Sequence, residues 1–387
     1  MNGMKFSVDG HAIGRHLTGN EVYIRNLLNA FAGLDSTSEF VTYLSLDGPS
    51  PWVPARFAVR RVSANPFVRL GFELSRRLRE DRPDLLHVQY TAPLGCPVPV
   101  VVSIHDVSFL EHPQFFPRFR ALQLRLTVQR TVRSAAKILT LSEFSSAAIQ
   151  RAYGVSPDDV VVAPLAAAPE FRSLHIDNAL DAVRNGFQLP APYILSVGDL
   201  QPRKNQIGLI HAFAELAKNF PQLRHRLVFA GKETWFAPKV REAAKESGVG
   251  DRIRFLGFVT DQDLLHLYNA CDLFVFPSFY EGFGLPILEA MACGRAVTCS
   301  NTSAMPEVAD GAAILFNPHS IPEMTRAMAD LLRDAELRSR MERLGQQRAA
   351  LFSWQKSAQQ TLEVYYSVAE RSRREHPNTV HVSISSR

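Results

Sequence analysis

Features that mark several classes of protein are scarce or missing in this chain of 387 residues. It has only four cysteines, none spaced as CxxC, so neither a disulfide framework nor a thiolate metal site is expected. No apolar run reaches the length of about 18 residues that a membrane-spanning helix needs. The opening MNGMKFSVDG lacks the basic and then apolar plan of a secretory signal. We therefore expect a soluble, cytoplasmic protein with reduced thiols.

Length and composition favour two domains. One hydrophobic core rarely serves more than about 250–300 residues, and this chain is longer. Hydrophobic residues make up 46% and charged residues 21%, which is ordinary for a globular protein. The segment 172–192 is polar, bounded by prolines and without clear period, so we interpret it as the linker. We predict domains over 1–175 and 190–352 and a helix over 353–375, with 378–387 disordered.

Short apolar or β-branched runs along the chain predict strands. They lie at residues 5–9, 85–89, 98–104, 138–141, 160–163, 193–197, 227–230, 253–258, 273–277, 296–299 and 312–316. Helical spacing of apolar residues predicts a helix that begins near Asn20, and others over 206–218, 261–269, 321–332 and 335–352.

Acidic residues are absent between Glu111 and Glu143, whereas this segment carries several cations. These are Arg118, Arg120, Arg125, Arg130, Arg133 and Lys137. Such a patch suits nucleic acid, phospholipid or a polyphosphate substrate. No nucleic-acid motif accompanies it, so nucleic acid is not an expected partner.

The basic segment also suits a membrane surface. Residues 121–137 are compatible with a helix on which Leu122, Leu126 and Val132 share one face, and aromatic residues precede it. A basic helix with such an entry favours the headgroup layer of anionic lipid, which would place the protein at the inner face of the plasma membrane. The alternative is an ordinary domain helix whose arginines are solvated.

The stretch around which the chain is organised spans residues 273–296, LFVFPSFYEGFGLPILEAMACGRA. A strand leads into the glycine-flanked loop 281–284, and Pro286 suits the first turn of a helix. We expect the backbone N–H groups of Phe283, Gly284 and Leu285 to be unpaired and to point, with the helix dipole, at an anion. A phosphate is the natural occupant.

Two carboxylates frame this anion site. An ionised carboxylate only accepts hydrogen bonds, so Glu281 and Glu289 suit sugar hydroxyls better than phosphate. Glu289 lies about one turn into the helix and could reach a ribose, while Glu281 lies on the loop near the reacting end of a ligand. The alternatives are a first-turn partner of the helix dipole for Glu289 and a solvated loop charge for Glu281.

The segment EGFGLPILEAMACGRAV, with Glu281 and Glu289 in it, resembles the signature of retaining glycosyltransferases of family 4. The resemblance covers most of the chain. It implies the GT-B fold, an α/β architecture of two doubly wound Rossmann-like domains facing across a cleft. It also implies that the donor nucleotide binds the second domain and the acceptor the first, and that the helix over 353–375 crosses back to the first domain.

A basic pair precedes the predicted helix over 206–218. Arg203 and Lys204 stand where the helix dipole disfavours cations, which a bound diphosphate would explain. The family places its phosphate-binding pair at this match, so we assign both residues a catalytic role. The alternative is two solvated loop cations.

Other candidate residues follow from the resemblance. His105 and Asp106 end the predicted strand over 98–104, and ligands of open α/β sheets bind at the carboxyl ends of strands. The family match implies that His105 bonds a donor-sugar hydroxyl, and that Asp106 orients it or contacts the acceptor. A satisfied structural histidine is the alternative.

Two weaker donor-binding candidates lie at other turns. Gly19 and Asn20 stand at a helix N-terminus that faces the donor phosphate in the family, although GxGxxG is missing and an ordinary capped loop is the alternative. Val259 follows a strand whose turn meets the nucleotide base in the family.

The resemblance implies a retaining hexosyltransferase that uses a nucleotide diphosphate sugar and a hydroxyl of a glycan or lipid-linked saccharide. The opening over 9–28 resembles mannosyltransferases of bacterial surface-polysaccharide assembly, so GDP-mannose is the first donor hypothesis and UDP-glucose the second. No DxD stands in a metal-like loop, so no metal and no cofactor is expected. A sugar-phosphate phosphorylase, a nucleotide-sugar epimerase and a non-catalytic nucleotide-sugar binder remain alternatives.

Overall fold

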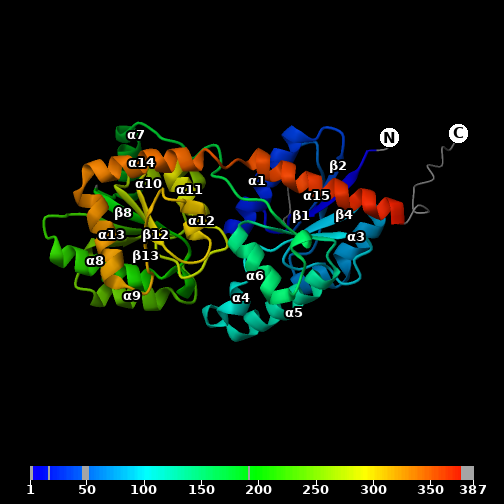
Figure 1. The fold of residues 1–387 in the computed structure, drawn as a ribbon, viewed down its shortest axis with the longest axis horizontal. Coiled ribbons are helices and arrows are strands. Elements are labelled where there is room, and N and C mark those ends of the chain that lie inside the picture. Colours follow the sequence, from blue (N-terminus) through cyan, green and yellow to red (C-terminus); the bar gives the residue numbers. More distant parts are fainter. Residues whose placement is uncertain (1–2, 16–17, 46–51, 191, 376–387) are drawn as a thin grey trace. The chain divides into compact units, whose positions relative to one another are not determined.

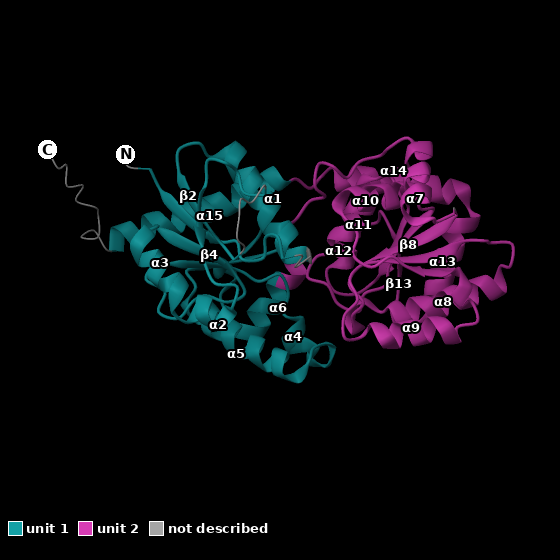
Figure 2. Ribbon diagram, turned by 180° about the vertical axis from the view of Figure 1, so that it is seen from behind, with its two compact units in different colours: residues 1–141, 146–164, 354–387 teal, residues 142–145, 165–353 magenta. Residues whose placement is uncertain are grey.

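The computed structural model describes residues 3–15, 18–45, 52–190 and 192–375. They form two compact units, which are coloured separately in Figure 2. Unit 1 comprises residues 1–141, 146–164 and 354–387, and unit 2 comprises residues 142–145 and 165–353. The tail over 378–387, for which we predict disorder, lies outside the described residues.

Unit 1 is built on a parallel sheet with the strand order β3-β2-β1-β4-β5-β6-β7 in its described part. The strands are β1 (Lys5–Asp9), β2 (Glu39–Leu44), β3 (Ala58–Arg61), β4 (Leu85–Gln89), β5 (Val100–Ser103), β6 (Lys137–Thr140) and β7 (Val160–Val162). The strand order reverses between β1 and β4, which pair in parallel. Every residue of β4 and β5 is buried, because helices cover both faces of a parallel sheet.

The helices of unit 1 surround this sheet (Figure 1). They are α1 (Thr18–Leu34), α2 (Pro66–Val68), the π-helix η1 (Arg69–Glu73), α3 (Leu74–Asp81), α4 (Ser108–Glu111), the 3-10 turn η2 (Pro113–Phe115), α5 (Arg118–Ser134), α6 (Glu143–Tyr153), η3 (Pro157–Asp159) and α15 (Trp354–Glu375). Helix α15 packs against α1, and Arg373 near its end bonds both carboxylate oxygens of Asp84 at 2.8 Å. The last helix of the chain is therefore part of unit 1.

Unit 2 repeats the plan with the strand order β10-β9-β8-β11-β12-β13. Its strands are β8 (Tyr193–Val197), β9 (Arg226–Ala230), β10 (Ile253–Phe255), β11 (Leu273–Phe276), β12 (Val297–Ser300) and β13 (Ile314–Phe316). The order reverses between β8 and β11, whose carboxyl ends are therefore the expected ligand site of this sheet. The predicted α/β class with two doubly wound domains is confirmed.

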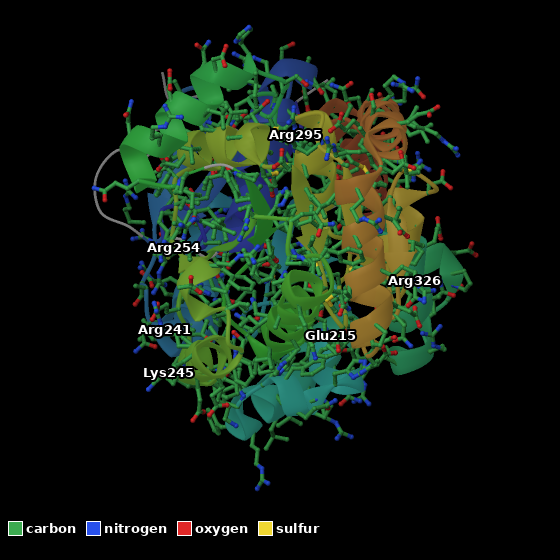
Figure 3. The ribbon with its side chains drawn as sticks, turned by 90° about the vertical axis from the view of Figure 1, so that its left-hand side faces the viewer. Glu215, Arg241, Lys245, Arg254, Arg295 and Arg326 are labelled. Atoms are coloured by element: carbon green, nitrogen blue, oxygen red, sulfur yellow. The ribbon has the colours of Figure 1, made fainter. Side chains whose placement is uncertain are left out.

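The helices of unit 2 carry apolar residues inward and charges outward. They are α7 (Ile176–Phe187), η4 (Pro202–Lys204), α8 (Gln206–Asn219), α9 (Ala237–Glu246), η5 (Gly250–Arg252), α10 (Asp261–Ala270), α11 (Leu285–Ala292), α12 (Met305–Ala309), α13 (Ile321–Arg333) and α14 (Ala335–Ala349). Figure 3 labels exposed charges of three of them, Glu215 on α8, Arg241 and Lys245 on α9 and Arg326 on α13. Buried Phe213, Leu227 and Met328 lie in the core between them.

Two expectations from the sequence are wrong. The segment 172–192, interpreted as a linker, contains helix α7, which packs against α10. Ala179 and Val183 are its buried residues; they stand four positions apart and so share one face, too narrow a stripe to reveal a period among polar neighbours. Val132 does not share the face of Leu122 and Leu126, because ten residues do not complete whole turns; it faces the core while both leucines are exposed.

Candidate functional site

The chain that leaves β8 at the switch point of unit 2 carries the predicted basic pair. Arg203 and Lys204 end the short turn η4, and Asn205, with φ of 52°, turns the chain into α8. Gly198 follows β8 with φ of 147°, and a Cβ on it would come 3.2 Å from Cε of Lys204. The positive φ favours glycine at 198, and the absence of a side chain there leaves room for Lys204 over the strand end.

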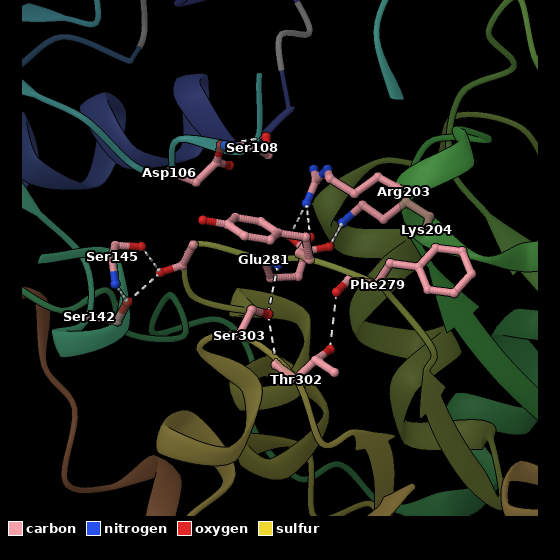
Figure 4. Close-up of polar contacts among 12 residues, drawn as sticks. Asp106, Ser108, Ser142, Ser145, Arg203, Lys204, Phe279, Glu281, Thr302 and Ser303 are labelled. Carbon is pink, nitrogen blue, oxygen red and sulfur yellow. Dashed lines mark hydrogen bonds and ion pairs between the residues drawn. The ribbon is translucent and has the colours of Figure 1, made fainter. Parts of the chain in front are cut away.

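The chain that leaves β11 brings a carboxylate to the same place. Oε2 of Glu281 lies 2.6 Å from Nη1 of Arg203, and Oε1 lies 2.8 Å from Nζ of Lys204 (Figure 4). Backbone contacts lock the two strand exits together, since Arg203 also donates to the carbonyl of Tyr280 at 2.6 Å and accepts from the N–H of Phe279 at 2.8 Å. The sequence predicts the three charged residues, but the structure adds that they form one ion cluster.

Glu281 is buried, whereas the side chains of Arg203 and Lys204 are 17% and 14% exposed, and the three charges act on one another. Burial alone raises the pKa of Glu281, but the positive charges of Arg203 and Lys204 outweigh it and lower this pKa from 4.5 to about 2. Burial lowers the pKa of Lys204, while the carboxylate of Glu281 opposes that shift. Nζ of Lys204 also lies 4.8 Å over the ring of Phe276. Within the cluster one carboxylate faces two partly buried cations, and Asp199 adds only a weaker negative charge near Lys204, so the arrangement suits an added anion.

Helix α11 begins beside this cluster and presents its N-terminus as predicted. Gly284 is its N-cap with φ of 108°, and Pro286 lies in its first turn. The backbone N–H groups of Phe283, Gly284 and Leu285 meet no hydrogen-bond acceptor in the part of the chain that the structure describes. The side chains of Phe283 and Leu285 are buried and apolar, so their backbone N–H groups are the hydrogen-bond donors that they can offer a ligand. Unpaired N–H groups at a helix N-terminus bind anions.

Glu289 and Val259 lie elsewhere in unit 2. Glu289 is on α11 with only 6% of its surface exposed, and its Oε2 accepts a hydrogen bond of 2.9 Å from the hydroxyl of Tyr268. Val259 is half-buried between β10 and the capped start of α10. Near it, Nζ of Lys232 lies 5.5 Å over the ring of Phe258, which is 49% exposed. The assigned ribose and base contacts stay predictions.

The loop over 279–282 is fixed by hydrogen bonds to hydroxyl groups of residues that are not among the predicted site residues (Figure 4). Oγ of Ser303 accepts the N–H of Glu281 at 2.9 Å, and Thr302 donates to the carbonyl of Phe279. Ser142 and Ser145 donate to the carbonyl of Gly282 at 2.7 and 3.0 Å. The signal that could have found the first pair is the run of hydroxyls in SNTS after the strand that ends at Ser300.

In unit 1, His105 and Asp106 follow β5 as predicted. His105 is buried, and its ring meets the edges of Tyr23 and Tyr90 at centroid distances of 4.7 and 5.6 Å. Burial lowers the pKa of His105 from 6.5 to about 4 against the opposing charge of Asp106, so the imidazole is neutral near pH 7. Oδ1 of Asp106 accepts the N–H and the hydroxyl of Ser108 at 2.9 and 2.6 Å. That oxygen therefore binds Ser108, the first residue of α4, whose N-cap is Val107.

A buried hydrogen-bonded chain supports the neighbours of His105. The hydroxyl of Tyr365, on α15, lies 2.5 Å from Nδ1 of His87, and Nε2 of His87 lies 2.6 Å from Oγ of Ser103. The hydroxyl of Tyr23 lies 2.8 Å from the same Oγ. Burial and the charge of His105 lower the pKa of His87 to about 3, so His87 takes part as a neutral ring. The chain fixes the tyrosine that borders His105.

Gly19 and Asn20 lie in the first turn of α1. A Cβ on Gly19 would meet no atom within 4 Å, and Gly19 is exposed, so the described structure has no need for glycine there. The structure therefore places the candidates in two groups. Unit 1 holds His105, Asp106, Gly19 and Asn20, and unit 2 holds the ion cluster, the start of α11, Glu289 and Val259.

Comparisons with known proteins also distinguish two parts of the chain. Residues 178–348 match the family described as Glycosyl transferases group 1, and residues 17–171 match Glycosyltransferase Family 4. The O-antigen chain mannosyltransferase B of Escherichia coli is 34% identical over 266 residues, which cover 68% of this chain and 69% of that protein. The serotype-specific mannosyltransferase WbdA of Escherichia coli is 31% identical over 282 residues, which cover 71% of this chain. The match spans about a third of WbdA, 34% of its length.

Among solved structures, sucrose-phosphate synthase from Thermosynechococcus elongatus superimposes with a TM-score of 0.77. The alignment covers 95% of this chain and 100% of the other at 18% identity. At that identity the similarity shows the fold alone, which is the predicted GT-B fold. No helix among the described residues is long and apolar enough to cross a membrane.

Proposed function

We propose, since this chain belongs to family 4 of the glycosyltransferases, that it transfers mannose from GDP-mannose to a hydroxyl of a glycan or lipid-linked saccharide during polysaccharide assembly. The observation that carries a nucleotide diphosphate sugar as donor is the ion cluster of Glu281, Arg203 and Lys204 beside the N-terminus of α11. The choice of mannose is supported by the names of the similar mannosyltransferases.

The diphosphate is the part of the donor that this site suits. When the bond from the sugar to the diphosphate breaks, negative charge grows on the leaving oxygen. Lys204 and Arg203 offer N–H donors fixed by Glu281, and the backbone N–H groups at Phe283 and Gly284 offer more. These groups are oriented before the reaction, which is the condition under which electrostatic stabilisation is strongest.

The remaining roles follow the family match. Glu289 would bond the ribose, the backbone at Val259 would meet the base, and His105 would bond a hydroxyl of the transferred sugar as a neutral ring. Asp106 retains one carboxylate oxygen that no described hydrogen bond uses, and it would serve the acceptor.

We infer retention of the anomeric configuration from the family match, and the state of Glu281 bears on how retention is achieved. Both of its oxygens engage cations, and its lowered pKa marks a weakly basic carboxylate, so it is a poor nucleophile. We therefore propose transfer on one face of the sugar. The acceptor oxygen bonds to the anomeric carbon as the bond to the diphosphate breaks, and the acceptor proton passes to the leaving diphosphate.

Product analysis with labelled donors tests this proposal. Radiolabelled GDP-mannose and UDP-glucose are each incubated with the protein and a mannose-ended lipid-linked oligosaccharide, with and without EDTA. We expect mannosyl transfer, an axial anomeric linkage in the NMR spectrum, and no loss of rate with EDTA. Transfer from UDP-glucose alone would favour a glucosyltransferase, and release of a sugar phosphate or an epimer would favour the other enzyme classes. Donor binding without turnover would favour a binding protein.

We also propose that unit 1 docks on anionic membrane. Phe119, Leu122 and Leu126 of α5 are 75, 55 and 58% exposed and lie three and four residues apart, so they form one stripe, here called the apolar stripe of α5. Exposed Arg118, Arg120, Arg125 and Arg133 flank it. An apolar stripe between cations suits the headgroup layer of anionic lipid.

Vesicle flotation tests the docking. We expect binding to anionic but not to neutral vesicles at low salt, loss of binding at high salt, and loss in the variant with Phe119→Ser and Leu126→Ser. A control variant with Leu351→Ser, an exposed leucine of unit 2, should bind as the wild type does. No flotation with anionic lipid at low salt would refute the docking.

A further inference from the structure

A cavity of about 1040 Å³ opens on unit 1, and neither His105 nor Asp106 is among the residues that line it. It is lined by residues of α4, η2, α5 and the end of α6. Phe109, Phe116 and Leu122 contribute apolar walls, and Leu122 belongs at the same time to the apolar stripe of α5. The cavity therefore opens beside the surface proposed to meet lipid.

Its lining is positively charged. Arg118 and Arg125 of α5 and Arg151 of α6 line the cavity, together with one carboxylate, Glu111. Glu111 lies 3.7 Å from Arg151. Within the described residues, neither Arg118 nor Arg125 has a carboxylate within ion-pair distance. These two guanidinium groups lack a local counter-charge, so the cavity suits an anion.

A hydroxyl group in the lining lacks a partner. The phenolic oxygen of Tyr153 is buried and meets no hydrogen-bonding atom in the described structure. Burial raises the pKa of this phenol, so its O–H remains a donor at neutral pH. A buried donor without an acceptor destabilises the fold, and a ligand oxygen would satisfy it.

We propose that this cavity binds the phosphate group of an anionic membrane lipid. Arginine side chains recognise phosphate with parallel N–H donors, and Tyr153 supplies a neutral donor. A lipid fits better than a free phosphate compound, because the apolar walls and the apolar stripe continue from the charged lining. The inference rests on the proposed docking of unit 1 and names the lipid group that the surface recognises.

Matched arginine substitutions separate a specific cavity from diffuse charge. Binding is measured with vesicles of phosphatidylcholine that contain phosphatidylglycerol. Arg125→Ser with Arg151→Ser removes two cations of the cavity, whereas Arg120→Ser with Arg133→Ser removes two exposed cations of α5 that do not line it. We expect the first pair to weaken vesicle binding at least about tenfold more than the second. Equal losses would overturn the cavity and leave diffuse docking intact.

A soluble headgroup and a tyrosine variant test the cavity without vesicles. Glycerol 1-phosphate is titrated while NMR follows the Tyr153 ring, and we expect it to shift Tyr153 signals and to compete with vesicles. Tyr153→Phe should weaken both interactions at least about threefold while leaving the melting temperature unchanged or higher, since it removes an unsatisfied buried hydroxyl. Glycerol phosphate binding in a protein that ignores vesicles would overturn the lipid assignment. Stronger competition by RNA than by headgroup would point to nucleic acid and overturn it too. If vesicles bind but neither Tyr153 nor the cavity arginines matter, the docking stands and the cavity is refuted.

Discussion

Nζ of Lys204 lies 2.8 Å from Oε1 of Glu281, although the two residues stand 77 positions apart in the chain. Each follows one of the two strands, β8 and β11, between which the strand order of unit 2 reverses. A doubly wound sheet brings these two strand ends together, so the ion pair is a product of the topology. Because the ion pair lies largely out of water, removing either residue would leave the charge of the other without a partner.

Replacing Lys204 with Ala should lower kcat/KM at least about 100-fold, because the ammonium group acts on charge that develops in the transition state. The measurement is steady-state kinetics with the proposed donor. Lys245→Ala, an exposed lysine on α9, is the matched control and should keep the wild-type value. Activity of folded Lys204→Ala within threefold of the wild type would remove Lys204 from the mechanism.

Replacing the two carboxylates should give opposite kinetic patterns. Glu281→Gln should mainly lower kcat, because a neutral amide no longer fixes Arg203 and Lys204 against the donor. Glu289→Gln should mainly raise the KM of the donor, because a ribose contact is the same in the ground and transition states. Circular dichroism checks the fold of both variants. Swapped patterns would show that the two roles are assigned backwards.

The elements and residues of unit 2 that form the site could be predicted from the sequence to different degrees. The start of α11 could be predicted, since local residue preferences decide such boundaries. The signals are the strand over 273–277, the glycine loop and the proline at 286. The partnership of Glu281 with Arg203 and Lys204 depends on strand order, which no local pattern encodes. The run of hydroxyls over 300–303 marks Ser303 as a candidate, but its bond to the N–H of Glu281 depends on the fold and not on spacing.

In unit 1, too, local sequence patterns do not predict everything: they miss an edge strand and a buried chain of hydrogen bonds. Strand β3 is short, half-exposed and rich in arginine, as an edge strand can be, so no apolar run marks it. The chain from Tyr365 through His87 to Tyr23 joins residues 278 and 80 positions apart, which only the folded sheet and the last helix bring together. The buried strands could be predicted from their apolar runs, whereas the long-range polar partners could not.

Replacing Gly198 with Ala should disturb the site more than it disturbs the fold. The new Cβ would lie 3.2 Å from Cε of Lys204, so the lysine side chain must shift by a few tenths of an ångström, which disturbs its 2.8 Å bond to Glu281. Gly248→Ala is the matched control, because it also places alanine at positive φ but meets no atom within 4 Å. We expect both variants to lose about 1 kcal/mol of stability from backbone strain, and only Gly198→Ala to lose more than about tenfold in kcat/KM. Equal kinetics for the two variants would show that the position of Lys204 does not depend on Gly198.

As the pH falls, unit 1 should lose stability through its two buried histidines before the carboxylates of Asp9 and Glu281 bind protons. His87 and His105 have pKa values of about 3 and 4 in the folded protein, against 6.5 for an ordinary histidine. Below pH 6.5 the unfolded chain binds a proton at each histidine that the folded unit does not, so stability is full above pH 6.5 and falls as the pH is lowered. Once the unfolded chain is protonated at both histidines, each of them lowers the free energy of unfolding by about 1.4 kcal/mol for every further unit by which the pH falls.

The carboxylates of Asp9 and Glu281 affect stability in a lower range of pH than the two histidines do. Their pKa values fall from 3.8 and 4.5 to about 2, so the stability that they add is lost only below about pH 4.5. Hydrogen exchange of amides in β4 and β5, followed from pH 7.5 to 5, therefore isolates the histidines. We expect His105→Gln to reduce the slope of stability against pH by about 1.4 kcal/mol per unit relative to the wild type. A flat profile between pH 6.5 and 5 would contradict the buried neutral state of both rings, and an unchanged slope in His105→Gln would contradict it for His105 alone.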